Sequence, residues 1–218
     1  MSQRLRDRFV TVDESLALGD WMVTITKPRS AEELISEADF DLDERLPYWA
    51  DLWPSAAVLA EQVLARARPT WRTLELGCGL GLASLAARRR GLDVLATDYY
   101  EDALRFAELN ATQNGVAPLA TRHADWRQWP ADLVDFDLIL GADILYERPM
   151  GTLVAEVLGQ ALAQGGRAWI SDPGRVGAET FLERCAPLGL RTRRRNVPHP
   201  ADPDRRIALY TVTRASDD

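Results

Sequence analysis

Residues 73–87 read Thr-Leu-Glu-Leu-Gly-Cys-Gly-Leu-Gly-Leu-Ala-Ser-Leu-Ala-Ala, and residues 94–98 read Val-Leu-Ala-Thr-Asp. In the first stretch an apolar strand ends near Glu75, turns through glycines at every second position and opens a helix. In the second stretch, about one strand–helix–strand unit later, another strand ends at Asp98. This layout predicts a nucleotide-type cofactor site at the carboxyl edge of a parallel sheet.

The glycine spacing narrows the type of cofactor. Gly77, Gly79 and Gly81 form a G-x-G-x-G pattern, whereas a dinucleotide fingerprint needs its third glycine at the position of Leu82. The loop also lacks the lysine of a Walker-type phosphate cradle. A cofactor with a ribose and no pyrophosphate fits better, which makes S-adenosylmethionine the candidate. The alternative is a tight strand-to-helix turn that binds nothing.

Length, composition and charge limit which kinds of protein this chain can be. A chain of 218 residues with 46% hydrophobic content can bury one sizeable core. Its net charge of −7 argues against nucleic-acid binding. The sequence has no apolar run long enough for a membrane span and no apolar signal core, so we expect a soluble, cytoplasmic protein, with a monomer favoured. Cys78 and Cys185 are far apart and form no CxxC, so we expect no metal site.

Strands and helices alternate from residue 72 onward. We expect strands at about 72–76, 93–98, 118–122, 136–142, 166–171, 190–195 and 206–213, and helices at about 80–90, 101–113, 150–163 and 177–187. Right-handed crossovers then require an α/β fold, a Rossmann-like doubly wound seven-stranded sheet. Residues 196–204 join the last two strands without a helix, so the last strand should be antiparallel to its neighbours.

The N-terminal part is predicted to be an extension, residues 1–45, that precedes the main domain at residues 46–218. Weak alternation over residues 8–26 indicates a β-hairpin, and Ser30 could cap a short helix from residue 31 to about residue 37. A longer helix should start at Trp53-Pro54-Ser55 and run to about residue 66.

These features together resemble the class I S-adenosylmethionine-dependent methyltransferases. The segment Pro47-Tyr-Trp-Ala-Asp-Leu-Trp-Pro-Ser-Ala56 is similar to the tryptophan-proline segment that precedes the core in the methyltransferase-16 family of protein lysine methyltransferases. Asp143-Ile-Leu-Tyr146, at the end of the fourth strand, matches the Asp-x-x-Tyr motif of that family. The resemblance covers about residues 45–213.

The resemblance implies a set of cofactor-binding residues. Asp98 would accept hydrogen bonds from both ribose hydroxyls, because a carboxylate has two acceptor oxygens. The backbone of the glycine loop would approach the methionine part of the cofactor, and Trp53 would lie over it. The implied set is Trp53, Glu75, Gly77, Cys78, Gly79, Gly81, Asp98, Tyr99, Asp125, Trp126 and Ala142. Asp98 could instead cap the helix at 101–113, and the tryptophans could simply pack.

The same resemblance implies Asp143 and Tyr146 as catalytic residues. Methyl transfer to nitrogen needs a neutral amine, and lysine has a pKa of about 10.4, so its neutral form costs about 4 kcal/mol at pH 7. A carboxylate beside an ammonium raises the pKa of that ammonium, so Asp143 is expected to orient the nitrogen and not to act as its base. Tyr146 would supply an aromatic wall or a hydroxyl acceptor. A helix cap and a packed tyrosine are the alternative.

The function expected from this resemblance is N-methylation of a lysine side chain of a protein substrate. One alternative is a small-molecule N-methyltransferase that acts on a free amine or heterocycle. Another is a cofactor-binding interaction module with little turnover, which the presence of both Asp143 and Tyr146 disfavours. Leu82 disfavours a nicotinamide-dependent oxidoreductase.

Overall fold

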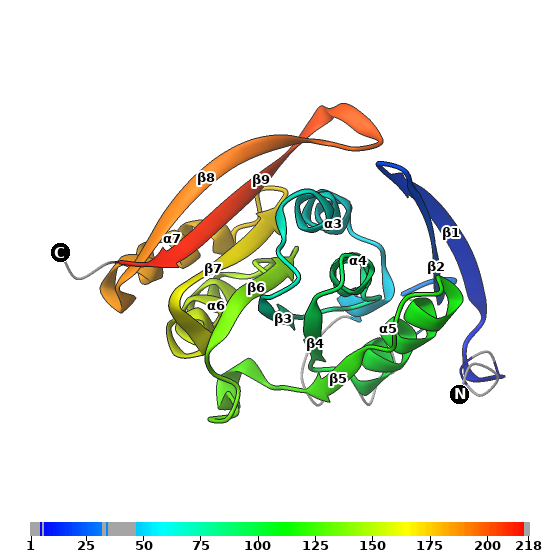
Figure 1. Ribbon diagram of the computed structural model, residues 1–218, viewed down its shortest axis with the longest axis horizontal. Helices are drawn as coiled ribbons and strands as arrows, with labels where there is room; N and C mark the ends of the chain where they lie inside the picture. Colours follow the sequence, from blue (N-terminus) through cyan, green and yellow to red (C-terminus); the bar gives the residue numbers. More distant parts are fainter. Residues whose placement is uncertain (1–4, 6, 32–33, 35–46, 216–218) are drawn as a thin grey trace.

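The structure, a computed structural model, describes residue 5, residues 7–31, residue 34 and residues 47–215. Its centre is a seven-stranded sheet in the order β5-β4-β3-β6-β7-β9-β8 (Figure 1). The strands are β3 (Arg72–Leu76), β4 (Asp93–Asp98), β5 (Ala120–His123), β6 (Phe136–Ala142), β7 (Leu162–Asp172), β8 (Leu190–His199) and β9 (Asp202–Arg214). Strands β3 to β7 pair in parallel, whereas β9 pairs antiparallel with both β7 and β8. The predicted fold class, with its antiparallel last strand, is confirmed.

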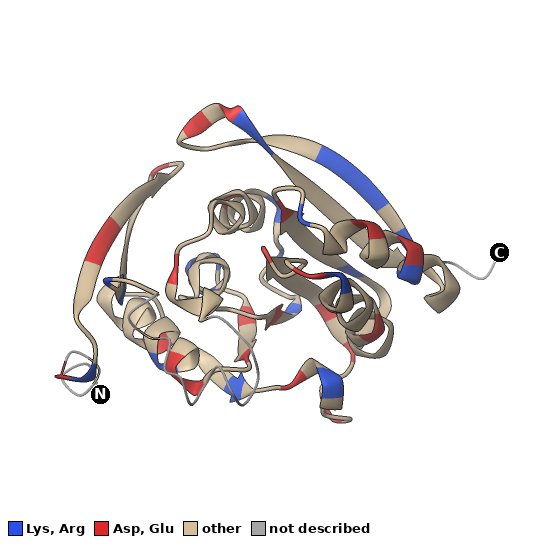
Figure 2. Cartoon of the chain, turned by 180° about the vertical axis from the view of Figure 1, so that it is seen from behind, with Lys and Arg blue, Asp and Glu red and all other residues tan. Residues whose placement is uncertain are grey.

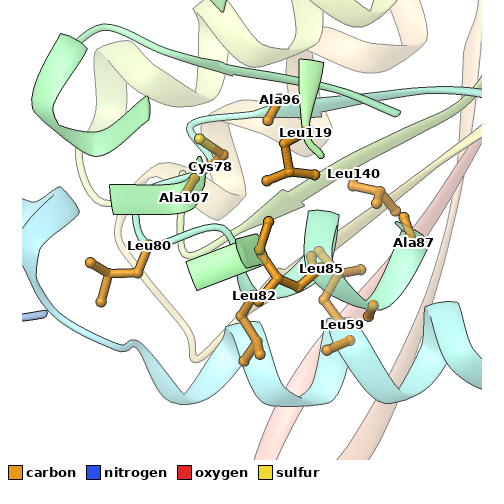
Figure 3. Close-up of a cluster of buried hydrophobic side chains, with 14 of the residues drawn as sticks. Leu59, Cys78, Leu80, Leu82, Leu85, Ala87, Ala96, Ala107, Leu119 and Leu140 are labelled. Carbon is orange, nitrogen blue, oxygen red and sulfur yellow. The ribbon is translucent and has the colours of Figure 1, made fainter. Parts of the chain in front are cut away.

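Two layers of helices cover the sheet (Figure 1). The helices are α3 (Pro54–Arg66), α4 (Leu82–Arg89), α5 (Glu101–Gln113), α6 (Arg148–Ala161) and α7 (Gly177–Cys185), with short 3-10 turns η2 (Tyr48–Ala50), η3 (Trp126–Gln128) and η4 (Ala186–Leu188). Successive side chains of β6 point to opposite faces of the sheet and so belong to two different parts of the core. Leu138 and Leu140 pack with α3, α4 and α5, and Ile139 packs with α6 and α7. Figure 3 shows Leu140 among the apolar side chains of the first layer.

The expected N-terminal hairpin is present as a separate two-stranded sheet, β1 (Thr11–Leu18) and β2 (Trp21–Pro28). Buried Asn110 on α5 holds it, because its Oδ1 accepts from the Thr26 N–H at 2.8 Å and its Nδ2 donates to the Thr26 carbonyl at 3.1 Å. The helix expected at residues 31–37 lies largely outside the described residues.

The last hairpin differs from the sequence expectation. The connection expected at residues 196–204 is mostly strand, because Asn196 pairs with Ala208 and Val197 with Ile207. Pro198 is tolerated there because β8 is an edge strand, so the hydrogen-bonding groups along its outer edge have no partner strand. Several shorter differences concern element ends: β5 starts at residue 120, α6 spans residues 148–161, and β7 already starts at residue 162.

Strand β8 also carries a run of positive charge. Figure 2 shows basic residues along this edge strand, and four of them are exposed: Arg191, Arg193, Arg194 and Arg195. Charged side chains on an edge strand discourage pairing with a second chain, so the stripe protects the open edge of the sheet.

Candidate active site

One cleft gathers all the residues that the sequence assigned to cofactor binding or catalysis. It lies at the carboxyl ends of β3, β4 and β6. The strand order reverses between β3 and β6, and ligands of open α/β sheets usually bind at such a point. Its lining includes Trp53, Glu75, Gly77, Cys78, Gly79, Gly81, Asp98, Tyr99, Asp125, Trp126, Ala142, Asp143 and Tyr146. The individual roles of these residues stay predictions.

The glycine loop needs glycine for two reasons. Gly77, Gly79 and Gly81 have φ values of 61°, 50° and 87°, in the left-handed region that other residues avoid. At Gly81 a Cβ atom would also lie 2.7 Å from the Cβ of Ala107 on α5, and at Gly77 it would lie 3.1 Å from the Ile144 side chain. The loop therefore packs tightly against α5 while its backbone borders the cleft.

Asp98 lies at the end of β4, and its carboxylate fixes the loop. Its Oδ2 accepts from the Gly79 N–H at 2.9 Å and its Oδ1 from the Tyr100 N–H at 3.0 Å. Burial raises the pKa of Asp98. The helix-cap alternative is not supported, because the N-cap of α5 is Tyr100. Each oxygen of the carboxylate keeps acceptor capacity, so Asp98 can still receive two hydroxyl groups.

Glu75 lies beneath the loop and connects β3 to α4. Its Oε2 accepts from the Ser84 N–H at 2.8 Å and, in a short contact, from the Ser84 hydroxyl. The side chain is almost entirely buried, and this burial raises the pKa of Glu75 to about 7. The contact holds the first turn of α4 against the end of the strand.

Another part of the lining of the cleft is formed by η3 and the residue before it, Asp125. The carboxylate of Asp125 accepts several hydrogen bonds from the Arg127 guanidinium, the shortest at 2.8 Å from Nη2. That guanidinium also lies 5.4 Å from the centre of the Tyr99 ring. Arg127 was not identified from the sequence, although it lies two positions from Asp125.

Asp143 lies in the left-handed region at φ 58°, which aspartate tolerates better than most residues. Its N–H donates to the Ser171 carbonyl at 2.9 Å. Its Oδ2 accepts from the Ser55 hydroxyl at 2.9 Å, and its Oδ1 accepts from Nε of Arg175 at 2.7 Å. The carboxylate is only 2% exposed, whereas the side chain of Arg175 is 34% exposed.

Aromatic rings surround this end of the cleft. The ring of Tyr146 lies 5.1 Å from that of Tyr48, which in turn lies 6.1 Å from Trp53. The Trp53 indole donates to the Tyr48 carbonyl at 2.7 Å, and the Arg175 guanidinium lies 5.0 Å from the Trp53 ring centre. Sequence reasoning missed Tyr48, Ser55 and Arg175. Of these, Tyr48 and Ser55 lie inside the tryptophan-proline segment, while Arg175 carries no local motif.

Most of the cleft belongs to a region that this chain shares with known proteins. A family profile described as a methyltransferase domain matches residues 73–166, which include the glycine loop, Asp98 and Asp143. Residues 73–166 thus match a methyltransferase domain, and the fold around them is that of the class I S-adenosylmethionine-dependent methyltransferases. The ribosomal protein L11 methylase of Lactobacillus delbrueckii subsp. bulgaricus has the same fold, with a TM-score of 0.58, 23% identity, and coverage of 72% of this chain and 77% of that one.

Curated relatives of this methyltransferase domain carry more than one activity. An electron transfer flavoprotein beta subunit lysine methyltransferase of Danio rerio is 31% identical over 61% of this chain and 52% of its own length. A ubiquinone biosynthesis O-methyltransferase of Xanthomonas axonopodis pv. citri is 30% identical over 61% of this chain and 59% of its own. An EEF1A lysine methyltransferase 3 of Mus musculus is 32% identical over 53% and 52%. The chain thus spans little more than half the length of these relatives.

The cofactor of this domain is S-adenosylmethionine, and the donor set of the cleft fits it. The two oxygens of the Asp98 carboxylate can accept from the ribose hydroxyls. Gly77 and Gly79 line the cleft without a Cβ, for which there is little room, so their backbone suits close approach of the methionine part. Tyr99 and Trp126 offer flat apolar surface for a base. Separately, no helix in the described ranges is both long and apolar enough to cross a bilayer.

Proposed function

We propose that this chain is an S-adenosylmethionine-dependent N-methyltransferase whose acceptor is a lysine side chain of a protein. The observation that carries the proposal is the acceptor end of the cleft, where Asp143 and Tyr146 lie with the rings of Tyr48 and Trp53. Aromatic rings offer apolar surface for the methylene chain of a long alkylamine. The relatives that are named lysine methyltransferases support the same acceptor.

Cofactor binding in this proposal follows the predicted assignment. Asp98 receives the ribose hydroxyls, the backbone of the glycine loop borders the methionine part, and Tyr99, Asp125 and Trp126 enclose the adenine. When bound, S-adenosylmethionine supplies a methyl group on a positively charged sulfur. Glu75 acts indirectly, because it holds Ser84 and with it the start of α4.

The protein contributes positioning more than acid–base chemistry. Well-oriented reactants recover about 7–11 kcal/mol of a bimolecular barrier, so fixed walls around the acceptor nitrogen are the main requirement. Asp143 is covered, and its two oxygens accept from Ser55 and Arg175, so in this proposal it orients the acceptor through Arg175 and does not act as a base that exchanges protons. Tyr146 would border the acceptor nitrogen.

A small-molecule acceptor is the second candidate. The relatives named as O-methyltransferases of ubiquinone biosynthesis match at nearly the same identity, so an acceptor other than a protein is consistent with the shared domain. In either case we propose a monomeric, cytoplasmic enzyme whose methyltransferase domain spans residues 46–218.

The two candidates are separated by following the methyl group. The protein is incubated with methyl-labelled S-adenosylmethionine and a lysate of source cells that lack its gene, so that acceptors are unmethylated. Label in acid-precipitated protein supports the protein acceptor, and label confined to the soluble fraction supports the small molecule. Asp98→Ala, which is expected to weaken cofactor binding, serves as the control and should lower the label in both fractions. Absence of label in both fractions would contradict the proposed activity.

A further inference from the structure

At the acceptor end of the cleft the guanidinium of Arg175 is more exposed than the carboxylate of Asp143, the motif residue with which it pairs. The Asp143 carboxylate is 2% exposed, whereas the Arg175 side chain that pairs with it is 34% exposed and lines the cleft. Within the described part of the chain, Nε is the only guanidinium atom of Arg175 with a hydrogen bond. The two terminal nitrogens therefore keep their donors for the cleft.

Arg175 is held in this place from three sides. Asp143 binds its Nε at 2.7 Å, and the ring of Trp53 lies 5.0 Å from its guanidinium. Its backbone is fixed as well, because Oδ1 of buried Asp172 accepts from the Gly174 N–H at 2.7 Å and the Arg175 N–H at 2.8 Å. A guanidinium fixed in this way is preorganised and permanently charged.

We propose that Arg175 keeps the acceptor amine neutral in the bound state. The inference rests on the proposed amine acceptor and assigns Arg175 as an electrostatic residue of that site. A fixed positive charge disfavours an ammonium beside it and leaves a neutral amine unaffected. A protonated acceptor therefore transfers its proton to solvent water as it enters, and the free amine is the species that is bound.

The alternative arrangement is an acceptor ammonium that displaces Arg175 from Asp143. That exchange would place the ammonium against a buried carboxylate, which stabilises the protonated form and opposes methyl transfer. While Arg175 stays paired with Asp143, it covers the carboxylate, so an entering ammonium meets the more exposed guanidinium first. The chemistry of the reaction thus favours an Arg175 that stays in place.

Other ionisable groups near the guanidinium are carboxylates and phenols. They are Asp172 on the same turn and, in the lining of the cleft, Tyr48, Asp51, Tyr146 and Glu147. All are present in every variant used below, so a difference between wild type and an Arg175 variant reports the guanidinium.

The test measures the pKa of an amine in the site. The probe is n-butylamine, a lysine side-chain analogue labelled with ¹³C next to the nitrogen, added to the protein loaded with S-adenosylhomocysteine. The chemical shift of the bound probe is followed between pH 7 and 10. In wild type we expect a bound pKa below that of free butylamine by about one pH unit, because a neighbouring like charge disfavours the protonated amine.

Substitutions at Arg175 show how much of the change in the pKa of the bound amine is due to the guanidinium charge. Arg175→Lys should keep the lowered pKa of the bound amine, and Arg175→Gln should return it to the free value or above. Because Arg175→Gln leaves Asp143 buried without its cation, Asp143→Asn/Arg175→Gln is measured as well and should also give a value near that of free butylamine. Arg184→Gln is the matched control, since Arg184 is on α7 and pairs with Glu156 outside the cleft.

Three outcomes would overturn the inference: a bound ammonium in wild type, an equally lowered pKa in Arg175→Gln, or no saturable binding of the amine. These outcomes are separate from failure of the proposed function. Labelled lysine in lysate protein together with any of them would remove only the role of Arg175. A neutral bound butylamine without labelled protein would remove only the protein acceptor.

Discussion

The Ser55 hydroxyl donates a hydrogen bond of 2.9 Å to Oδ2 of Asp143, a residue 88 positions further along the chain. Ser55 belongs to the tryptophan-proline segment and Asp143 to the Asp-x-x-Tyr motif, so the contact joins two motifs that the sequence shows only separately. The Ser171 hydroxyl continues the connection, because it donates to the Ser55 carbonyl at 2.8 Å. The start of α3 is thereby fixed to the acceptor end of the cleft.

Asp98→Ala should weaken binding of S-adenosylhomocysteine by about 1.5–3 kcal/mol, the contribution of hydrogen bonds to a charged group. Isothermal titration calorimetry measures this loss. Asp93→Ala is the matched control, because Asp93 begins the same strand and its side chain is 90% exposed at the other end. Equal affinity of the Asp98 variant and wild type would return Asp98 to a purely structural role.

Glu75 should make folding stability depend on pH. Its pKa is raised to about 7 in the folded state from an ordinary value of 4.5. Between these values the folded state holds a proton that the unfolded state has lost, so the contribution of Glu75 to stability falls as pH rises and levels off above 7. From pH 5 to 7.5 the loss is about 2 kcal/mol.

The measurement is urea denaturation of wild type and Glu75→Gln at both pH values. The substituted glutamine does not titrate, so the variant should gain stability relative to wild type as pH rises. Taking the difference between the two proteins cancels titration of other groups. A constant difference between pH 5 and 7.5 would show that the pKa of Glu75 is not raised.

Gly81→Ala should destabilise the fold more than Gly115→Ala. Both glycines have positive φ, at 87° and 63°, which costs a non-glycine residue about 1–2 kcal/mol. A Cβ at Gly81 meets Ala107 at 2.7 Å, which adds about 1–3 kcal/mol of overpacking, whereas a Cβ at Gly115 meets nothing within 4 Å. Chemical denaturation compares the two. Equal losses would mean that α5 moves freely away from the glycine loop.

Asp143→Asn should lower the rate of methyl transfer at least tenfold and leave the affinity for S-adenosylhomocysteine within a few-fold. The variant keeps the side-chain shape and tolerates the left-handed backbone. Asp135→Asn is the control, because Asp135 has φ 59° but is exposed outside the cleft. With Asp143 intact, the rate should rise as pH increases above 7, since a neutral amine must form. A rate that is flat from pH 6 to 9, with chemistry limiting, would contradict the orienting role.

The sequence predicted the sheet and the cofactor side of the cleft well, because both depend on local signals. Hydrophobic periodicity located β3, β4, β6 and α5 to the residue, and the spacing of Gly77, Gly79 and Gly81 indicated the loop. Arg175 was missed because its role depends on contacts with Asp143 and Trp53, which are distant in sequence. The pairing of residues 196–199 was missed because proline and aspartate favour turns locally, while the long edge hairpin overrides that preference.

The most direct test of the central claim identifies the atom that receives the methyl group. Protein labelled with methyl-labelled S-adenosylmethionine in the lysate is hydrolysed to amino acids, which are then separated beside methylated standards. We expect the label in methyllysine, present with wild type and strongly reduced with Asp143→Asn. Label in methylarginine, in base-labile esters or only in small molecules would contradict a protein-lysine N-methyltransferase.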